Sequence, residues 1–168
     1  MISLDFSKAF DTVQYSTQLE KMAKLDIPAN AYNWLVHFVG DHTHSTVYNG
    51  ERSKMKFITA DIIQGLAIGP ASYVATSRDL NAVIPENRLV KFADDACLVI
   101  PASNDDSRTV EIRNVETWAC QNNLTLNSAK TKEIVVLFVD RHQRHQMQQP
   151  PLLSDIARVS SMKILGIT

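Results

Sequence analysis

Short apolar runs alternate along this chain with segments of helical periodicity, a pattern typical of an α+β protein. Apolar residues three or four positions apart predict helices over residues 17–27 and 31–40, and a long one after the polar residues 104–106. A fourth helix is predicted to open at Pro70, because the first turn of a helix tolerates proline. Its predicted inner face contains Tyr73, Ser77, Leu80 and Ile84.

Strands are predicted where apolar residues run together or alternate with polar ones. Residues 46–48 and 54–59 flank Asn49-Gly50, a dipeptide that favours a tight turn, and therefore predict a hairpin. Residues 89–92 and 96–100 predict a second hairpin. Further strands are predicted at residues 2–6, 133–139, 156–159 and 162–167. We expect helices on one face of a small antiparallel sheet.

Composition fits one globular domain with a substantial core. The chain has 168 residues, of which 45% are hydrophobic and 21% charged. Its net charge of −1 is unusual for a nucleic-acid polymerase, whose surface is normally basic to counter phosphates. If the chain acts on nucleic acid, we expect the basic parts to lie elsewhere in a longer parent protein.

Several function classes receive no support from the sequence. No run is long enough for a membrane span, and none has the layout of a signal peptide. Cys97 and Cys120 lack metal-ligand spacing and predict reduced, buried thiols of an intracellular protein. The polar residues 141–151 predict a solvated loop; zinc binding by His142 and His145 is the weaker alternative, because no Cys stands near them.

Candidate chemistry comes from paired acids. Asp94-Asp95 sits between two apolar strands. Carboxylates in such a place lose hydration and repel each other, so the arrangement favours binding of a cation such as Mg²⁺. A solvated turn is the alternative, because Asp favours turns. Asp5 closes another apolar strand and, facing Asp94, could share two metal ions about 3.5–4 Å apart. Asp11, by contrast, is expected to cap the helix that follows.

Five stretches resemble, in order, motifs of reverse transcriptases in the form used by non-LTR retrotransposons. The resemblance implies a right-hand polymerase palm and RNA-directed DNA synthesis by nucleotidyl transfer. It covers nearly the whole chain, so residues 1–168 would form a partial domain without fingers and thumb. The resembling stretches are residues 4–13 (first catalytic motif), 63–70 (second), 92–95 (third), 122–131 (fourth) and 163–167 (end of the palm).

The resemblance implies a role for each matching residue. Asp5 and Asp94 would be catalytic metal ligands with the backbone carbonyl of Phe6, and Asp95 a further acid of the site. The ion would be Mg²⁺, with Mn²⁺ as an alternative. Phe10 would exclude a ribose 2′-hydroxyl and so select deoxynucleotides. The other implied contacts are Gln64, Gly65 and Lys130 with the nucleotide, and Lys163 and Gly166 with the primer.

The implied partners are an RNA template, a DNA primer and dNTPs, with no membrane. The fingers, the thumb and an endonuclease would belong to a longer polyprotein, located in cytoplasm and nucleus as for a retrotransposon protein. The isolated chain is therefore expected to have little polymerase activity. Two alternatives remain: a non-catalytic retrotransposon relic or binding module with the palm fold, and the palm of an RNA-templated RNA polymerase.

Overall fold

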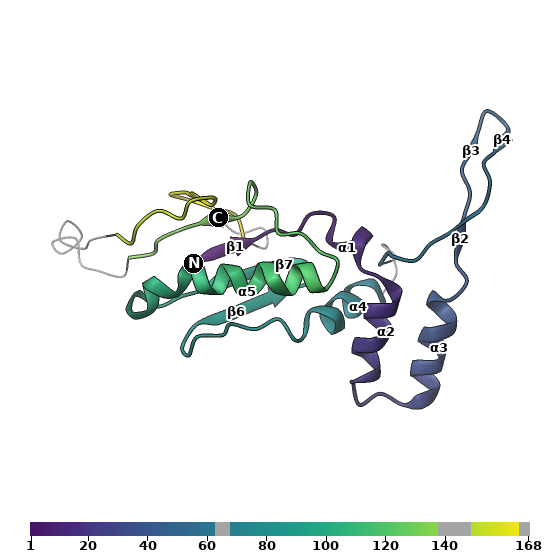
Figure 1. Ribbon diagram of the computed structural model, residues 1–168, viewed down its shortest axis with the longest axis horizontal. Coiled ribbons are helices and arrows are strands. Elements are labelled where there is room, and N and C mark those ends of the chain that lie inside the picture. The colour runs from purple at the N-terminus through teal and green to yellow at the C-terminus, as the bar shows by residue number, and fades with distance from the viewer. Residues whose placement is uncertain (63–67, 138–148, 165–168) are drawn as a thin grey trace. The chain divides into compact units, whose positions relative to one another are not determined.

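The computed structural model describes residues 1–62, 68–137 and 149–164. The chain is grouped into two compact units (Figure 1). Unit 1 contains Met1–Ser7 and Asp79–Thr168, and unit 2 contains Lys8–Arg78. None of the helices in the described ranges combines the length and apolar character needed to cross a membrane.

Unit 1 is built on a five-stranded sheet in the order β6-β7-β1-β8-β9. Its strands are β1 Ile2–Leu4, β6 Arg88–Phe92, β7 Asp95–Val99, β8 Lys132–Glu133 and β9 Ala157–Arg158. The pairs β6–β7, β7–β1 and β1–β8 are antiparallel, as predicted, but β8 and β9 are parallel. The prediction of a purely antiparallel sheet is therefore wrong at this edge. A long connection, residues 134–156, allows the chain to return in the same direction.

Of the three C-terminal strand predictions, 156–159 is confirmed in part by β9, whereas 133–139 and 162–167 are wrong over most of their described residues. β8 ends at Glu133, so residues 134–137 do not extend it as predicted, and residues 138–139 lie outside the described ranges. Residues 162–163 are not in a strand and Ile164 forms only a bridge, while the remainder of the predicted 162–167 strand lies outside the described ranges.

Helix α5, Arg108–Gln121, covers one face of this sheet after the short 3₁₀ helix η1, Ala102–Ser107 (Figure 1). Leu4 pairs with Ala96 across β1 and β7, and both side chains are buried. The ring of Phe6, just beyond β1, meets Trp118 of α5 edge-on, with ring centroids 6.0 Å apart. The long helix predicted after residues 104–106 is thus confirmed, and its apolar side forms the core of unit 1 with alternate residues of β1 and β7.

The described residues of unit 2 form four helices: α1 Ala9–Thr12, α2 Tyr15–Ala23, α3 Ala29–Val39 and α4 Ile68–Ser77. Helix α2 starts before the predicted residue 17 and ends before residue 27. Asp11 lies inside α1 and caps nothing, since Gln14 is the residue that precedes α2 and makes no side-chain cap. Helix α4 ends at Ser77, so Leu80 and Ile84 lie outside it, contrary to the prediction.

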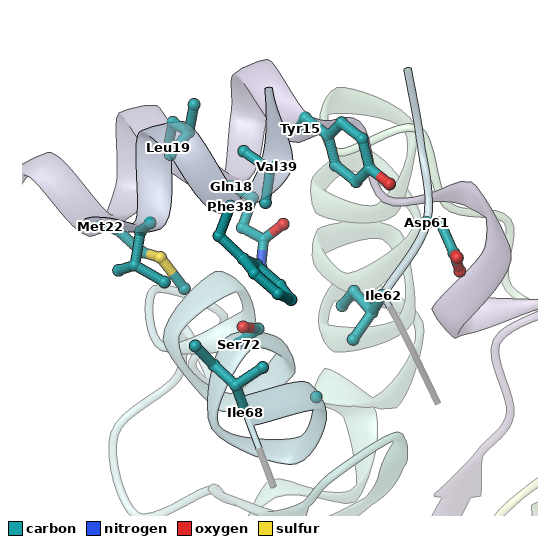
Figure 2. A pocket seen from close by; sticks show the side chains of 12 residues that line it. Tyr15, Gln18, Leu19, Met22, Phe38, Val39, Asp61, Ile62, Ile68 and Ser72 are labelled. Carbon is teal, nitrogen blue, oxygen red and sulfur yellow. The ribbon is translucent and has the colours of Figure 1, made fainter. Parts of the chain in front are cut away.

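A small cavity of about 20 Å³ lies among α2, α3 and α4 (Figure 2). Leu19, Met22 and Phe38 are among the apolar side chains that line it. Gln18 also lines it; its Oε1 atom is buried, and no described residue donates a hydrogen bond to it. The volume suffices for a single water molecule, which could satisfy that oxygen.

Four short strands continue unit 2 beyond α3: β2 Thr43–His44, β3 Val47–Tyr48, β4 Glu51–Arg52 and β5 Lys56–Phe57. The hairpin at Asn49-Gly50 is confirmed, because β3 pairs with β4 and both turn residues have positive φ, +50° and +82°. The second predicted strand, residues 54–59, is shorter and pairs instead with β2.

Candidate active site

The acidic hairpin joins β6 to β7 through a two-residue turn, Ala93-Asp94, with Phe92 paired to Asp95. Ala93 has a φ of +51°, a left-handed conformation that costs a residue with a side chain about 1–2 kcal/mol. Asp94 and Asp95 are both exposed. The expectation that these carboxylates lose hydration is therefore wrong, because the turn projects them beyond the core.

The strand register brings Asp5 to the same edge of the sheet. Leu4 lies opposite Ala96, and the register continued by one residue sets Asp5 opposite Asp95. Directly opposed positions on antiparallel strands place their Cβ atoms about 4.5–5.5 Å apart. Leu4 and Ala96 are buried towards α5, and side chains alternate along a strand. Asp5 and Asp95 therefore lie on the face that α5 leaves open, with Asp94 next to them in the turn.

Two hydrogen bonds fix the backbone of Asp5 from the side of β8. Its amide donates to Thr131 Oγ1 at 3.3 Å, and its carbonyl accepts from the amide of Asn127 at 2.7 Å. Thr131 is fully buried, so its hydroxyl has a defined position. No role was predicted for Asn127 or Thr131, although both belong to the stretch that resembles the fourth motif.

The carbonyl of Phe6 points towards the side of β1 on which β7 lies. Phe6 forms an antiparallel bridge with Leu126, flanked by hydrogen bonds from Asn127 N to Asp5 O and from Ser7 N to Thr125 O. In such a non-hydrogen-bonded pair, each residue's own amide and carbonyl face away from the partner segment. The geometry thus supports a backbone oxygen of Phe6, rather than its buried ring, as part of the candidate site.

A shallow cavity of about 40 Å³ lies on the open face, next to the acids. Asp95 and Phe92 line it from the hairpin, and Lys163 and Ile164 line it from the C-terminal segment. The structure thus brings Lys163 and Asp95 together. Lys130 is exposed, in the turn that Asn127 opens.

The other predicted site residues are Phe10, Gln64, Gly65 and Gly166. Phe10 belongs to unit 2, where its half-buried ring packs against Tyr73 with centroids 5.2 Å apart. Gln64, Gly65 and Gly166 lie outside the described residues. Their roles stay predictions.

The donor set at the hairpin suits a hard divalent cation. Among residues 1–62, 68–137 and 149–164, no three His, Cys, Asp or Glu side chains gather as a metal-binding group. Mg²⁺ commonly takes only one or two carboxylates from a protein, and completes its shell with water and substrate phosphates. Two carboxylates and the Phe6 carbonyl, all oxygen donors, fit that requirement.

A buried ionic cluster supports the sheet beside the site. Glu133, on β8, accepts hydrogen bonds from Arg108 Nη1 at 2.8 Å and from Arg158 Nε at 2.8 Å. Both arginines also bind the carbonyl of Pro151. Sequence reasoning missed this cluster, although a glutamate at the start of the apolar run 133–139 signals a partner.

Comparison with known proteins gives a consistent family. Residues 1–168 match the model of a family described as reverse transcriptase (RNA-dependent DNA polymerase). The chain is 27% identical over 142 residues to the RNA-directed DNA polymerase from mobile element jockey of Drosophila funebris, and 24% identical over 142 residues to that of Drosophila melanogaster. It is 24% identical over 139 residues to a probable RNA-directed DNA polymerase from transposon X-element of Drosophila melanogaster. Each match covers 78% of this chain but 15% of the relative. The chain belongs to the reverse transcriptase family.

Proposed function

We propose that this chain forms the palm of a retrotransposon polymerase. The polymerase copies RNA into DNA by two-metal nucleotidyl transfer. In this proposal Asp5 and Asp94, with the Phe6 carbonyl, hold Mg²⁺ or Mn²⁺, and Asp95 is a further acid of the centre. The observation that carries the proposal is the pairing of Leu4 with Ala96, because this register, continued by one residue, sets Asp5 opposite Asp95 at the acidic hairpin.

The chain's own residues have distinct parts in this proposal. Asp5 is positioned through its backbone by Thr131 and Asn127. The ions, when bound, neutralise charge on the attacking and leaving oxygens of phosphoryl transfer. Lys163, which shares a cavity with Asp95, would contact the primer together with Gly166. The nucleotide contacts are proposed for Phe10, Gln64, Gly65 and Lys130.

The proposed partners are an RNA template, a DNA primer and dNTPs. The chain spans about 15% of the length of the curated relatives it matches, and its net charge is −1. Both observations support a longer protein whose other parts hold the nucleic acid. The location proposed for it, as for a retrotransposon protein, is the cytoplasm and nucleus. On its own, the 168-residue chain would then have little polymerase activity.

A second candidate is a non-catalytic relic or binding module that keeps the palm fold. The exposure of Asp94 and Asp95 favours it, because exposed acids need no cation to offset lost hydration. Metal affinity separates the two candidates: a relic would bind Mn²⁺ no better than an Asp94→Asn variant does.

Primer extension tests the proposed reaction. The longer reading frame containing these residues, given Mg²⁺, an RNA template and a DNA primer, should incorporate dNTPs in preference to NTPs. Asp94→Asn should reduce incorporation at least about tenfold, since even outer-shell partners of a metal are worth that much. Incorporation that is unaffected by Asp94→Asn, or that favours NTPs, would refute the proposal. Processive synthesis by the 168-residue chain alone would refute its expected inactivity.

A further inference from the structure

The segment from β2 to β5, residues 43–57, exposes more large apolar side chains than a solvated hairpin requires. We refer to it as the 43–57 extension; in Figure 1 it continues from α3 away from the helices of unit 2. Tyr48 and Phe57 are 76% and 75% exposed, and Val47 and Met55 are 60% and 65% exposed. Contiguous apolar side chains on a surface commonly mark an interaction site.

The same extension concentrates positive charge. Arg52, Lys54 and Lys56 are all exposed, and Glu51 is the only acid between residues 43 and 57. The whole chain, by comparison, has a net charge of −1. None of these three cations forms an ion pair with another residue in the described part of the chain. The surface is therefore complementary to a polyanion.

Its strand geometry sets Lys56 and Phe57 on opposite faces. Lys56 lies opposite His44 and Phe57 opposite Thr43, and successive side chains of a strand point to opposite faces. Lys56 and Phe57 thus occupy opposite faces of a narrow ribbon, and Arg52 shares a face with Val47, which lies opposite to it in the β3–β4 pair. A flexible single strand can reach both faces, with phosphates on the cations and bases on the aromatic rings, whereas a stiff duplex cannot.

We propose that the 43–57 extension binds single-stranded RNA. This inference rests on the proposed function, which supplies an RNA template as the single-stranded polyanion. Lys54 and Lys56 bind backbone phosphates, and Phe57 stacks on a base. The extension is thus a template contact contributed by this chain, separate from the carboxylates.

Fluorescence anisotropy with a labelled single-stranded RNA of about 12 nucleotides tests this, using the 168-residue chain. Replacing both Lys54 and Lys56 by Gln should weaken binding at least about fivefold at low salt. The slope of log affinity against log salt should fall by about 0.7 for each lost phosphate contact. Phe57→Ser should weaken binding about fivefold and leave that slope unchanged, because stacking releases no counterions.

The matched control replaces Lys24 and Arg113, two exposed cations outside the extension, by Gln. It should leave affinity and salt slope unchanged. Equal effects of the control and the Lys54/Lys56 variant would overturn the inference, as would absence of binding by the unchanged chain. The inference would also be overturned if the substitutions weakened binding only to DNA or only to double-stranded nucleic acid. If the variants weaken RNA binding as expected but the longer protein does not incorporate dNTPs, the proposed polymerase function is refuted and the RNA-binding inference stands. If dNTPs are incorporated but the variants bind RNA as tightly as the unchanged chain, only the RNA-binding inference is refuted.

Discussion

The amide of Asp5 donates a hydrogen bond to the hydroxyl of Thr131, 126 residues further along the chain, at 3.3 Å. Thr131→Val removes the acceptor and keeps the shape. The free energy of unfolding should fall by about 1 kcal/mol, because a part-buried amide loses its partner. Mn²⁺ affinity should fall about tenfold, since Asp5 is then less firmly placed. Urea denaturation and a Mn²⁺ titration measure the two effects.

Thr109→Val, at an exposed position of α5, is the control for that substitution. This substitution should leave the Mn²⁺ affinity unchanged. A Thr131→Val protein that is less stable but binds Mn²⁺ as before would show that the hydroxyl supports the fold only.

Ala93→Gly should stabilise the protein, because glycine adopts the observed φ of +51° without steric cost. We expect the free energy of unfolding to rise by up to about 1 kcal/mol. Ala71→Gly, inside α4, should lower it by about the same amount, because glycine is a poor helix former. Chemical denaturation measures the free energy of unfolding of both variants. If both substitutions lower it equally, the backbone at Ala93 is not strained.

Glu133→Ala should be severely destabilising. It leaves the charges of Arg108 and Arg158 without their buried partner, at a cost of about 3–5 kcal/mol in the free energy of unfolding. Glu20→Ala breaks an exposed pair with Lys24 and should change stability little. The comparison is made by urea denaturation. Similar losses for both variants would contradict the account of the cluster.

Thiol labelling should distinguish the two cysteines. Cys97 is buried, as predicted, but Cys120 is exposed, so the prediction of two buried thiols is wrong for Cys120. Burial raises the pKa of the Cys97 thiol, an effect that the nearby terminal ammonium only partly offsets. Iodoacetamide should therefore modify Cys120 quickly and Cys97 only on unfolding. Faster labelling of Cys97 in the folded protein would contradict this.

The same raised pKa predicts a loss of stability in alkali. The unfolded chain ionises this thiol at a lower pH than the folded protein does. Stability is thus unaffected below about pH 8.5, the ordinary pKa of cysteine, and falls as the pH rises from there through the folded pKa. Cys97→Ala should remove this part of the alkaline loss, as denaturation series at increasing pH would show.

Local chemistry made some elements of this fold predictable. Asn49-Gly50 accepts the two positive φ angles of its turn, so the hairpin followed from the sequence. The periodicity of residues 31–40 likewise predicted α3 closely. The acids were found because a charged residue at the end of an apolar strand needs a reason to be there.

What escaped prediction depends on distant contacts. Helix α2 begins at Tyr15 because tertiary structure fixes its entry: the Tyr15 amide donates to Thr59 O, and Gln14 bridges to Ala60. No local signal reports such partners. The anchoring of Asp5 by Thr131 escaped prediction for the same reason, since it depends on a register set by strands far apart in the chain.

A Mn²⁺ titration followed by electron paramagnetic resonance tests the central claim most directly. The unchanged chain, Asp5→Asn, Asp94→Asn and the control Asp106→Asn, an exposed acid of η1, are compared. The account predicts that the unchanged chain and the control bind Mn²⁺ alike, while each of the other two variants binds at least about tenfold more weakly. Equal affinity in all four proteins, or no binding by the unchanged chain, would contradict it.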